Sequence, residues 1–205
     1  DRRSQADGCG THVYGGRVPT RGQRGLQPDA RELAQELLAD LPDRWAHTEG
    51  VAGAAELAGS SLPAVDRDAL VSTAWLHDIG YSLACRRTGF HALDGAIELL
   101  HRGFPPRIAA LVAHHSAAGY EASVRGLEQE LEPFSRESGP VADALTWADM
   151  TTDPLGHRTD AESRVAEILD RYAESDPVHH AIRAAAPDLL AAVRRTEDRL
   201  ATASR

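Results

Sequence analysis

The sequence predicts an all-α protein, a single compact bundle of about seven to nine helices. From residue 28 onward, apolar residues recur at intervals of three and four, which is the spacing along one face of a helix. Prolines and glycines fall at the ends of these stretches, where they start and stop helices. No stretch of any length shows the alternation of apolar and polar residues that is typical of a half-buried strand.

Five helices are expected in the first half of the chain. The first starts at Pro28 and Asp29. The next three cover about 42–59, 66–78 and 90–101, and the fifth starts at Pro105 and Pro106. In the first of them, leucines at 33, 37, 38 and 41 share one face. Gly80 is expected to end the third, because glycine commonly closes a helix at its C-terminus. Gly103 is expected to stop the fourth.

The second half is expected to hold a loop-rich or helical insertion at 119–137, a helix at about 140–150 and two more at about 160–173 and 178–201. The last two have an apolar face but no chemical motif, so we expect a helical pair (160–205) that packs on the domain or on a second subunit. Residues 28–205 then form one domain with its core at about 40–155. Residues 1–27 hold six of the 17 glycines and no apolar period, which predicts a disordered or loosely attached arm.

Length, charge and residue usage exclude several classes of protein. At 205 residues, the chain is long enough for one domain with a core. Acidic residues outnumber basic ones 31 to 22, and the net charge of -9 argues against a nucleic-acid surface. Every basic residue is arginine, which excludes lysine Schiff-base chemistry and a Walker lysine. Because no apolar run spans a membrane and no signal peptide is visible, we expect a cytoplasmic protein.

The chemistry of the chain lies in histidines and aspartates that border apolar helical segments. The candidates are His47, the adjacent His77 and Asp78, His91, the adjacent His114 and His115, and Asp149. A buried charge is costly unless it is paired, hydrogen-bonded or bound to a metal. Imidazole and carboxylate groups suit Zn, Fe, Mn, Co or Ni, and helix bundles build metal sites from side chains that point inward. These residues therefore predict a site for one or two divalent transition-metal ions.

The spacing of four of these residues resembles the HD-domain metal-dependent phosphohydrolases, over about residues 40–155. Those proteins carry a histidine, a His-Asp pair about 30 residues later and a distant aspartate, here His47, His77, Asp78 and Asp149. The context agrees, because Arg44 opens an Arg-x-x-His motif and Ile79-Gly80 follows the pair. The resemblance implies that these four residues hold a metal ion and that Arg44 contacts a substrate phosphate.

Two further histidines resemble the second metal site of many members of that family. His91 lies in a His-x-x-x-Gly-Ala segment, and either His114 or His115 supplies the other ligand, with Asp78 bridging both ions. This subset is similar to bacterial HD proteins that hydrolyse diadenosine tetraphosphate. The chain departs from them at Tyr81, where those proteins and the di-iron HD oxygenases typically carry lysine.

The resemblance implies hydrolysis of a nucleotide or other small phosphate ester by a metal-activated water. If only one ion binds, His91 or His115 is expected to serve as general acid. Arg86 and Arg87 are expected to frame a phosphate entrance, with specificity set by loops 82–90 and 116–137. Two alternatives stay open: a mixed-valent di-iron oxygenase, which Tyr81 disfavours, and a non-catalytic metal-bound signalling or binding module. Homo-oligomer formation is equally open.

Overall fold

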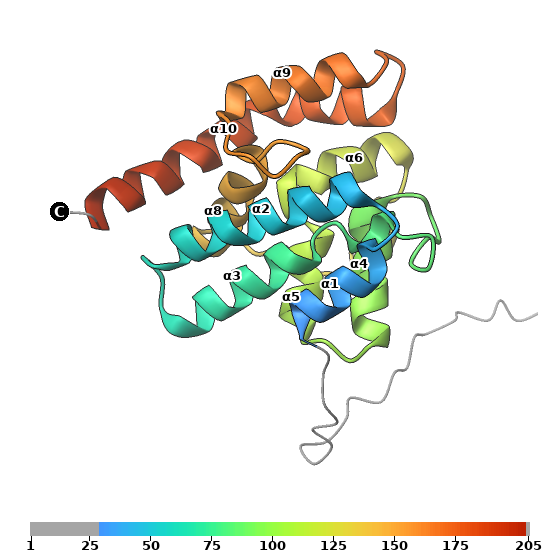
Figure 1. The fold of residues 1–205 in the computed structure, drawn as a ribbon. Helices are drawn as coiled ribbons and strands as arrows, with labels where there is room; N and C mark the ends of the chain where they lie inside the picture. The colour runs from blue at the N-terminus through green and yellow to red at the C-terminus, as the bar shows by residue number, and fades with distance from the viewer. Residues whose placement is uncertain (1–28, 204–205) are drawn as a thin grey trace, which may run out of the picture.

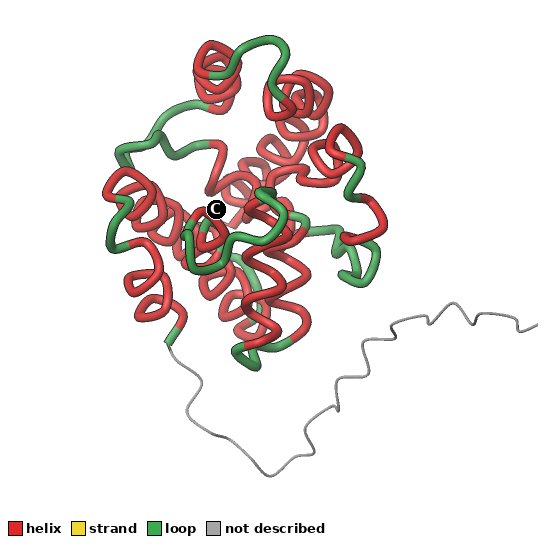
Figure 2. The backbone as a smooth tube through the Cα atoms, turned by 90° about the vertical axis from the view of Figure 1, so that its right-hand side faces the viewer, coloured by secondary structure: helices red, strands yellow, loops and turns green. Residues whose placement is uncertain are grey.

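The computed structural model describes residues 29–203, and the arm expected at 1–27 lies outside them. Within the described range the chain forms ten α-helices and two 3-10 helices (Figure 1), which confirms the all-α prediction. The helices are α1 (Ala30–Leu38), α2 (Pro42–Gly59), α3 (Ala64–Leu76), η1 (Ile79–Tyr81), α4 (His91–His101), α5 (Pro106–Ala113), η2 (His115–Ala117), α6 (Ala118–Arg125), α7 (Glu128–Leu131), α8 (Pro140–Met150), α9 (Ala161–Arg171) and α10 (Pro177–Ala203). Figure 2 shows short loops joining them.

Two expected features differ from the structure. The insertion at 119–137 forms the short helices α6 and α7, which takes the number of α-helices in residues 29–203 above the expected seven to nine. Gly80 does not end α3, which stops at Leu76 with His77 as its C-terminal cap. Gly80 lies instead in the middle of η1, where the backbone of another helix approaches it closely.

The core forms where α2, α3 and α8 pack against one another. Helix α2 turns Val51 and several alanines inward, and these small side chains let its neighbours approach closely. Leu70 and Leu76 of α3 are fully buried against them. Burying a leucine stabilises the fold by about 1.5–3 kcal/mol, so this packing fixes the helix ends that carry the histidines and aspartates.

The last two helices fold back over the same domain. In Figure 1, α9 and α10 lie together above α8, and α10 packs on α6, α8 and α9. Asp143 of α8 accepts hydrogen bonds from Arg195 and Arg199 of α10, which ties the C-terminal helix to the core. The expected helical pair therefore packs on the domain itself.

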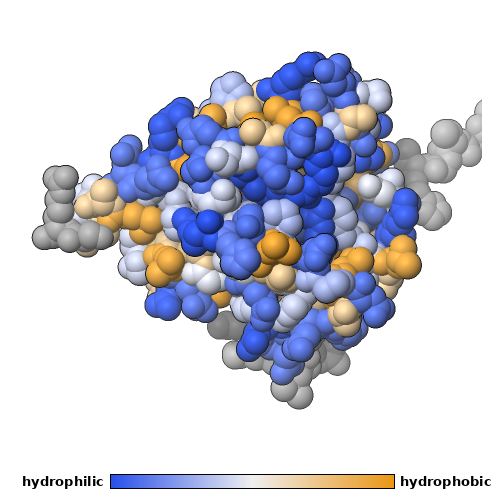
Figure 3. All heavy atoms as spheres, turned by 45° about the horizontal axis from the view of Figure 1, so that its top comes forward, coloured by the Kyte–Doolittle hydropathy of each residue, from blue (hydrophilic) through white to orange (hydrophobic). Residues whose placement is uncertain are grey.

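In residues 29–203, every helix is either too short or too polar to cross a bilayer. The face shown in Figure 3 is mostly hydrophilic, and its apolar residues are scattered rather than gathered in one patch. Apolar residues scattered singly over a protein surface need no functional explanation.

Candidate metal centre

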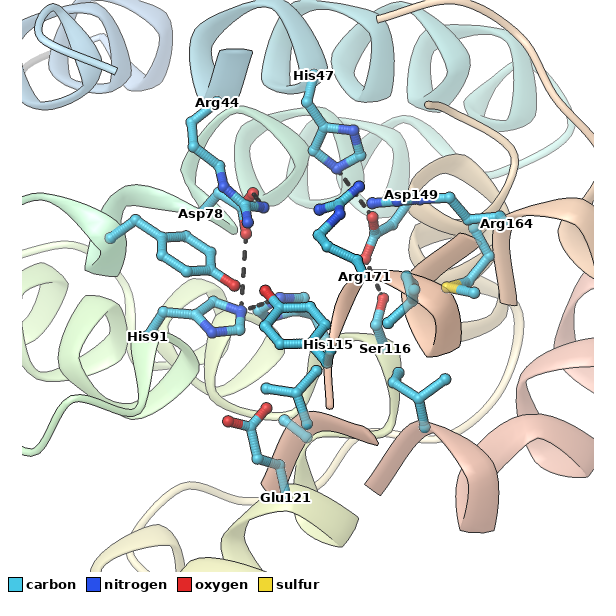
Figure 4. Close-up of a pocket in the computed structure, with 17 residues that line it drawn as sticks. Arg44, His47, Asp78, His91, His115, Ser116, Glu121, Asp149, Arg164 and Arg171 are labelled. Carbon is cyan, nitrogen blue, oxygen red and sulfur yellow. Dashed lines mark hydrogen bonds and ion pairs between the residues drawn. The ribbon is translucent and has the colours of Figure 1, made fainter. Parts of the chain in front are cut away.

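Six of the expected ligand residues converge where the ends of α3 and α5, the start of α4 and the faces of α2 and α8 meet: His47, His77, Asp78, His91, His115 and Asp149. Figure 4 shows all of them except His77. The potential ligand atoms of five of them form two groups, each with all atoms within 4.8 Å of one another, and Asp149 contacts His47 of the first group. The first group is His47, His77 and Asp78, and the second is Asp78, His91 and His115. Asp78 belongs to both groups, which is the position that a bridging carboxylate needs.

Backbone carbonyls orient three of the histidine rings. The Nδ1 atoms of His47, His77 and His115 lie 3.0, 2.8 and 2.6 Å from the carbonyl oxygens of Asp153, Ala74 and Val112. A carbonyl oxygen only accepts hydrogen bonds, so each Nδ1 carries the proton and donates it. In His77 and His115 this leaves the lone pair of Nε2 directed to the centre of the site, as in histidines that bind metals. Nε2 of His47 instead donates to Asp149 Oδ1 at 3.0 Å, and it would give up that proton when it binds a metal.

The donor atoms fit a metal ion because the described residues leave some of them without a hydrogen-bond partner. His77 is fully buried and its Nε2 makes no hydrogen bond, although Asp78 Oδ1 lies 3.5 Å away. A buried polar atom without a partner is costly. The Nε2 atoms of His91 and His115 lie 3.2 Å apart and share one hydrogen bond, which a metal ion bound to both rings would replace. A divalent ion of the Zn, Fe, Mn, Co or Ni type would satisfy these nitrogens and carboxylates together.

Burial and neighbouring charges decide which ligands are ionised. Burial opposes ionisation of Asp78, but His77 and Arg44 outweigh it and hold the pKa of this carboxyl well below its usual range. Burial lowers the pKa of His91 to about 3, despite the opposing charge of Asp78. At neutral pH Asp78 is therefore a carboxylate, and His91 is a neutral imidazole that can bind a metal.

Asp149 is held from two sides. Its Oδ1 lies 3.0 Å from Nε2 of His47, and its Oδ2 accepts a hydrogen bond from the Ser116 hydroxyl. Ser116 and the following Ala117 have φ values of 45° and 62°, a left-handed conformation that is uncommon outside glycine. Such residues cost about 1–3 kcal/mol each and cluster at functional sites. Here the turn directly after His115 brings the Ser116 hydroxyl onto Asp149.

Tyr81, the residue that departs from the family pattern, lies between two site residues. The Arg44 guanidinium carbon lies 3.9 Å from the centre of the Tyr81 ring, and the His91 ring stacks on it with a centroid distance of 4.2 Å. Two groups this close to one ring centre must cover opposite faces. Arg44 also donates to Asp78 Oδ2 at 3.0 Å. Tyr81 therefore packs Arg44 and His91 into fixed positions beside Asp78.

Gly80 and Gly95 allow η1, which follows Asp78, to lie close to α4, which begins with His91. A Cβ on Gly80 would lie 1.9 Å from the carbonyl oxygen of His91 and 2.7 Å from the nitrogen of Gly95. A Cβ on Gly95 would lie 3.2 Å from the nitrogen of Gly80. The absence of side chains lets η1 and α4 touch backbone to backbone. His91 Nε2 consequently lies 3.7 Å from Asp78 Oδ1.

Gly50 and Gly156 allow a similar close approach of two backbone segments beside His47. A Cβ on Gly50 of α2 would lie 2.4 Å from the carbonyl oxygen of Gly156. Gly156 has a φ of +82°, and a Cβ on it would lie 2.4 Å from the carbonyl oxygen of Ala46. This close approach brings the turn that contains Asp153 against α2, where the Asp153 carbonyl accepts its hydrogen bond from His47.

The loop before His91 is fastened to α4. Asp94 is fully buried and accepts hydrogen bonds from the backbone nitrogens of Arg87, Thr88 and Gly89. Its position in the first turn also suits a negative charge, because the helix dipole is positive there. Asp94 thus determines the direction in which the loop enters α4 and presents His91.

Three of the expected residues lie away from the cluster. His114 points elsewhere, and its Nε2 lies 2.7 Å from the carbonyl oxygen of Phe134, so of the two adjacent histidines the structure places His115 in the site. Arg86 and Arg87, expected at a phosphate entrance, do not line the pocket beside the cluster. Arg87 instead donates to His101 and pairs with Glu98 on the outer face of α4.

The pocket contains residues that the sequence did not single out. Besides Arg44 and the ligand cluster, side chains of α6, α9 and α10 line it: Glu121, Arg164, Ile168, Arg171, Tyr172, Val178 and Ile182. The segment from 160 onward had no recognisable motif. Arg164, Ile168 and Arg171 nevertheless share one face of α9, because they are spaced by four and three residues.

Comparison with known proteins identifies one match. Residues 44–175 match the family described as HD domain. Comparisons with curated proteins and with solved structures give no match. The matched segment is longer than the 40–155 expected from the motif at its C-terminal end, and it includes both ligand groups and the whole of α9.

Proposed function

The chain belongs to the HD domain family, and on that premise we propose that it is a metal-dependent hydrolase of phosphate esters or anhydrides. The observation that carries the proposal is the position of Asp78, whose carboxylate is shared by two groups of potential metal ligands. Two ions placed close together are a recurring arrangement in enzymes that cleave phosphate bonds. The substrate that we propose is a nucleotide or another small phosphate ester.

The residues divide into two proposed ligand sets. One ion would be held by His47, His77, Asp78 and Asp149. The other ion would be held by Asp78, His91 and His115. A bound divalent ion supplies positive charge that polarises a phosphoryl oxygen and lowers the pKa of a coordinated water. The chain contributes the rest: it keeps Asp78 and Asp149 ionised, and its buried walls limit the access of bulk water.

Arg44 is the proposed phosphate contact. One of its nitrogens donates to Asp78, and its side chain is only one-quarter exposed. The guanidinium has further N–H groups for phosphate oxygens. Its stacking on Tyr81 restricts its motion, so the donor is already oriented when the substrate arrives.

A role for His91 as a protonated general acid is disfavoured. Burial lowers the pKa of His91 to about 3, so at neutral pH the ring lacks the second proton that a general acid would donate. The facing Nε2 atom of His115 instead supports ligation by both rings.

The first test is the metal content of protein purified without chelator, measured by elemental analysis. We expect about two ions per chain in the wild type and about one in His91→Ala, because a lost ligand weakens its own site most. His101→Ala is the matched control, since His101 ends the same helix and does not line the pocket. It is expected to keep the wild-type content.

Activity is then measured as phosphate release from p-nitrophenyl phosphate, nucleotides and diadenosine tetraphosphate, with O₂ uptake as a control. Metal-dependent phosphate release supports the proposal. O₂ uptake without phosphate release would assign the oxygenase chemistry instead. A protein that binds no metal under any condition would overturn the enzymatic assignment.

A further inference from the structure

Helix α9 presents two arginines to the pocket beside the ligand cluster. Arg164, Ile168 and Arg171 line the pocket from one face of this helix. Figure 4 shows the side chains of Arg164 and Arg171 extending towards the middle of the pocket. Arginine is well suited to bind phosphate, because its planar fork matches two oxygens at once.

Helix α9 carries three acidic residues and two arginines, but among the ion pairs of the described residues only Glu167 pairs with these arginines. Arg164 and Arg171 both pair with Glu167, each with a different carboxylate oxygen, so two positive groups share one negative group. Arg164 is only 6% exposed, and its Nε makes no hydrogen bond with any described residue. A buried guanidinium with an unused N–H is costly unless an acceptor satisfies it.

The other ionised side chains of the pocket already have partners. Arg44 pairs with Asp78 at 3.0 Å, and Glu121 pairs with Arg125 at 2.7 Å. Asp149 accepts a hydrogen bond from His47. The positive charge that lacks a partner therefore lies on α9, on the wall of the pocket formed by the C-terminal helices.

Glu167 can leave its position more easily than Arg164. Its side chain is 39% exposed, whereas that of Arg164 is almost fully buried. A rotation of Glu167 into solvent would free N–H groups on both guanidiniums and raise the positive charge of this wall. An arriving anion would take over the hydrogen bonds that the carboxylate gives up.

We propose that Arg164 and Arg171 together bind a terminal phosphate group of the substrate, and that Glu167, which pairs with both arginines but does not line the pocket, competes with this anion for their N–H groups in the free protein. The inference rests on the proposed function. Arg44, the two arginines and every residue of the ligand cluster except His77 line one pocket. A terminal phosphate offers three non-bridging oxygens to them, whereas a phosphodiester inside a chain offers two. The substrate class is therefore a small molecule with a terminal phosphate, such as a phosphate monoester or a nucleotide, rather than an internal diester.

The apolar part of the pocket also indicates a small substrate. Ile168 of α9 and Val178 and Ile182 of α10 line the wall next to the arginines. They leave a compact apolar surface for the carbon part of the substrate. Tyr81 cannot stack on it, because Arg44 and His91 cover both faces of that ring.

The test measures binding of inorganic phosphate to the metal-loaded protein by titration calorimetry, and the kcat and KM for p-nitrophenyl phosphate. We expect Arg171→Gln to raise the Kd for phosphate and the KM by about 10-fold, since a lost hydrogen bond between charged groups has that effect. Arg86→Gln removes the same charge from an exposed residue that does not line the pocket. It is expected to change both constants less than about twofold.

Glu167→Gln tests the sign of the effect. If the carboxylate competes with the anion, the Kd for phosphate should fall several-fold, whereas a glutamate that only supports the arginines predicts weaker binding. Thermal unfolding of each variant checks its fold. Arg171 is preferred over Arg164 because its side chain is 34% exposed and its loss leaves no cavity in the core.

Failure of this inference can be told apart from failure of the proposed function. Equal constants for Arg171→Gln and Arg86→Gln, with hydrolysis retained, would reject the α9 site and leave the hydrolase. Phosphate binding that depends on Arg171 in a protein that hydrolyses no ester would keep the anion site and reject the hydrolase. Faster cleavage of bis(p-nitrophenyl) phosphate than of the monoester would reject the proposed substrate class.

Discussion

Replacing Gly80 by alanine is expected to break the second ligand group without changing any ligand. The added Cβ would lie 1.9 Å from the carbonyl oxygen of His91 and 2.7 Å from the nitrogen of Gly95. Non-bonded heavy atoms pack at about 3.5 Å, so α4 would have to withdraw by roughly 1.5 Å. Overpacking of this kind costs about 1–3 kcal/mol. The displacement also exceeds the roughly 0.5 Å within which a functional geometry must be held.

Elemental analysis and thermal unfolding measure the two consequences. We expect Gly80→Ala to fall from about two ions per chain to about one and its Tm to drop by roughly 4–10 °C. Gly53→Ala is the control, because a Cβ there meets nothing within 4 Å and Gly53 is exposed in α2. Alanine favours a helix over glycine by about 1 kcal/mol, so the control should keep its metal and its Tm should not fall. A Gly80→Ala protein with wild-type metal content and Tm would refute the reasoning.

Three further predictions address the ligands and the link between α8 and α10. His115→Ala should lose about one ion per chain while His114→Ala should lose none, by elemental analysis, because only His115 belongs to a ligand group; equal losses would contradict this. Chelation should lower the Tm and added metal should restore it, since an ion that binds only the folded chain stabilises it; a Tm that is unchanged after the ions are removed would contradict ligation by the folded site. Burial acts to raise the pKa of Asp143, but hydrogen bonds from Arg195 and Arg199 outweigh it and lower that pKa. Their stabilisation is present above about pH 4 and is lost as the pH falls through the lowered pKa, so urea unfolding of Asp143→Asn should depend less on pH in that acidic range than unfolding of the wild type.

Local signals in the sequence predicted most of the helices and most of the site residues, with His91 and Arg44 among them. Proline, aspartate and glycine start or stop helices through interactions with their immediate neighbours, so α1, α2, α4 and α5 fall close to where they were expected. The motif residues His47, His77, Asp78 and Asp149 could be recognised because their spacing and flanking residues are local as well. The structure brings all four of them together.

Other parts of the site depended on packing between distant segments. His114 and His115 are adjacent and chemically identical, and only the end of α5 and the left-handed turn at Ser116 decide which ring faces Asp78. The role of Gly80 is equally long-range. The residue resembles a helix-ending glycine in the sequence, but it is required where the backbone of α4 approaches.

The sequence by itself therefore determined the all-α class, the helix pattern and the chemical nature of a histidine and aspartate site, because periodicity and residue type express these properties directly. Only the tertiary structure decided how the helices meet, and with that which histidine completes the second ligand group. Only the tertiary structure places Arg164 and Arg171 of α9 in the same pocket as His47 of α2. The physical reason is that contacts across more than 100 residues depend on packing of whole helices, which no local pattern records.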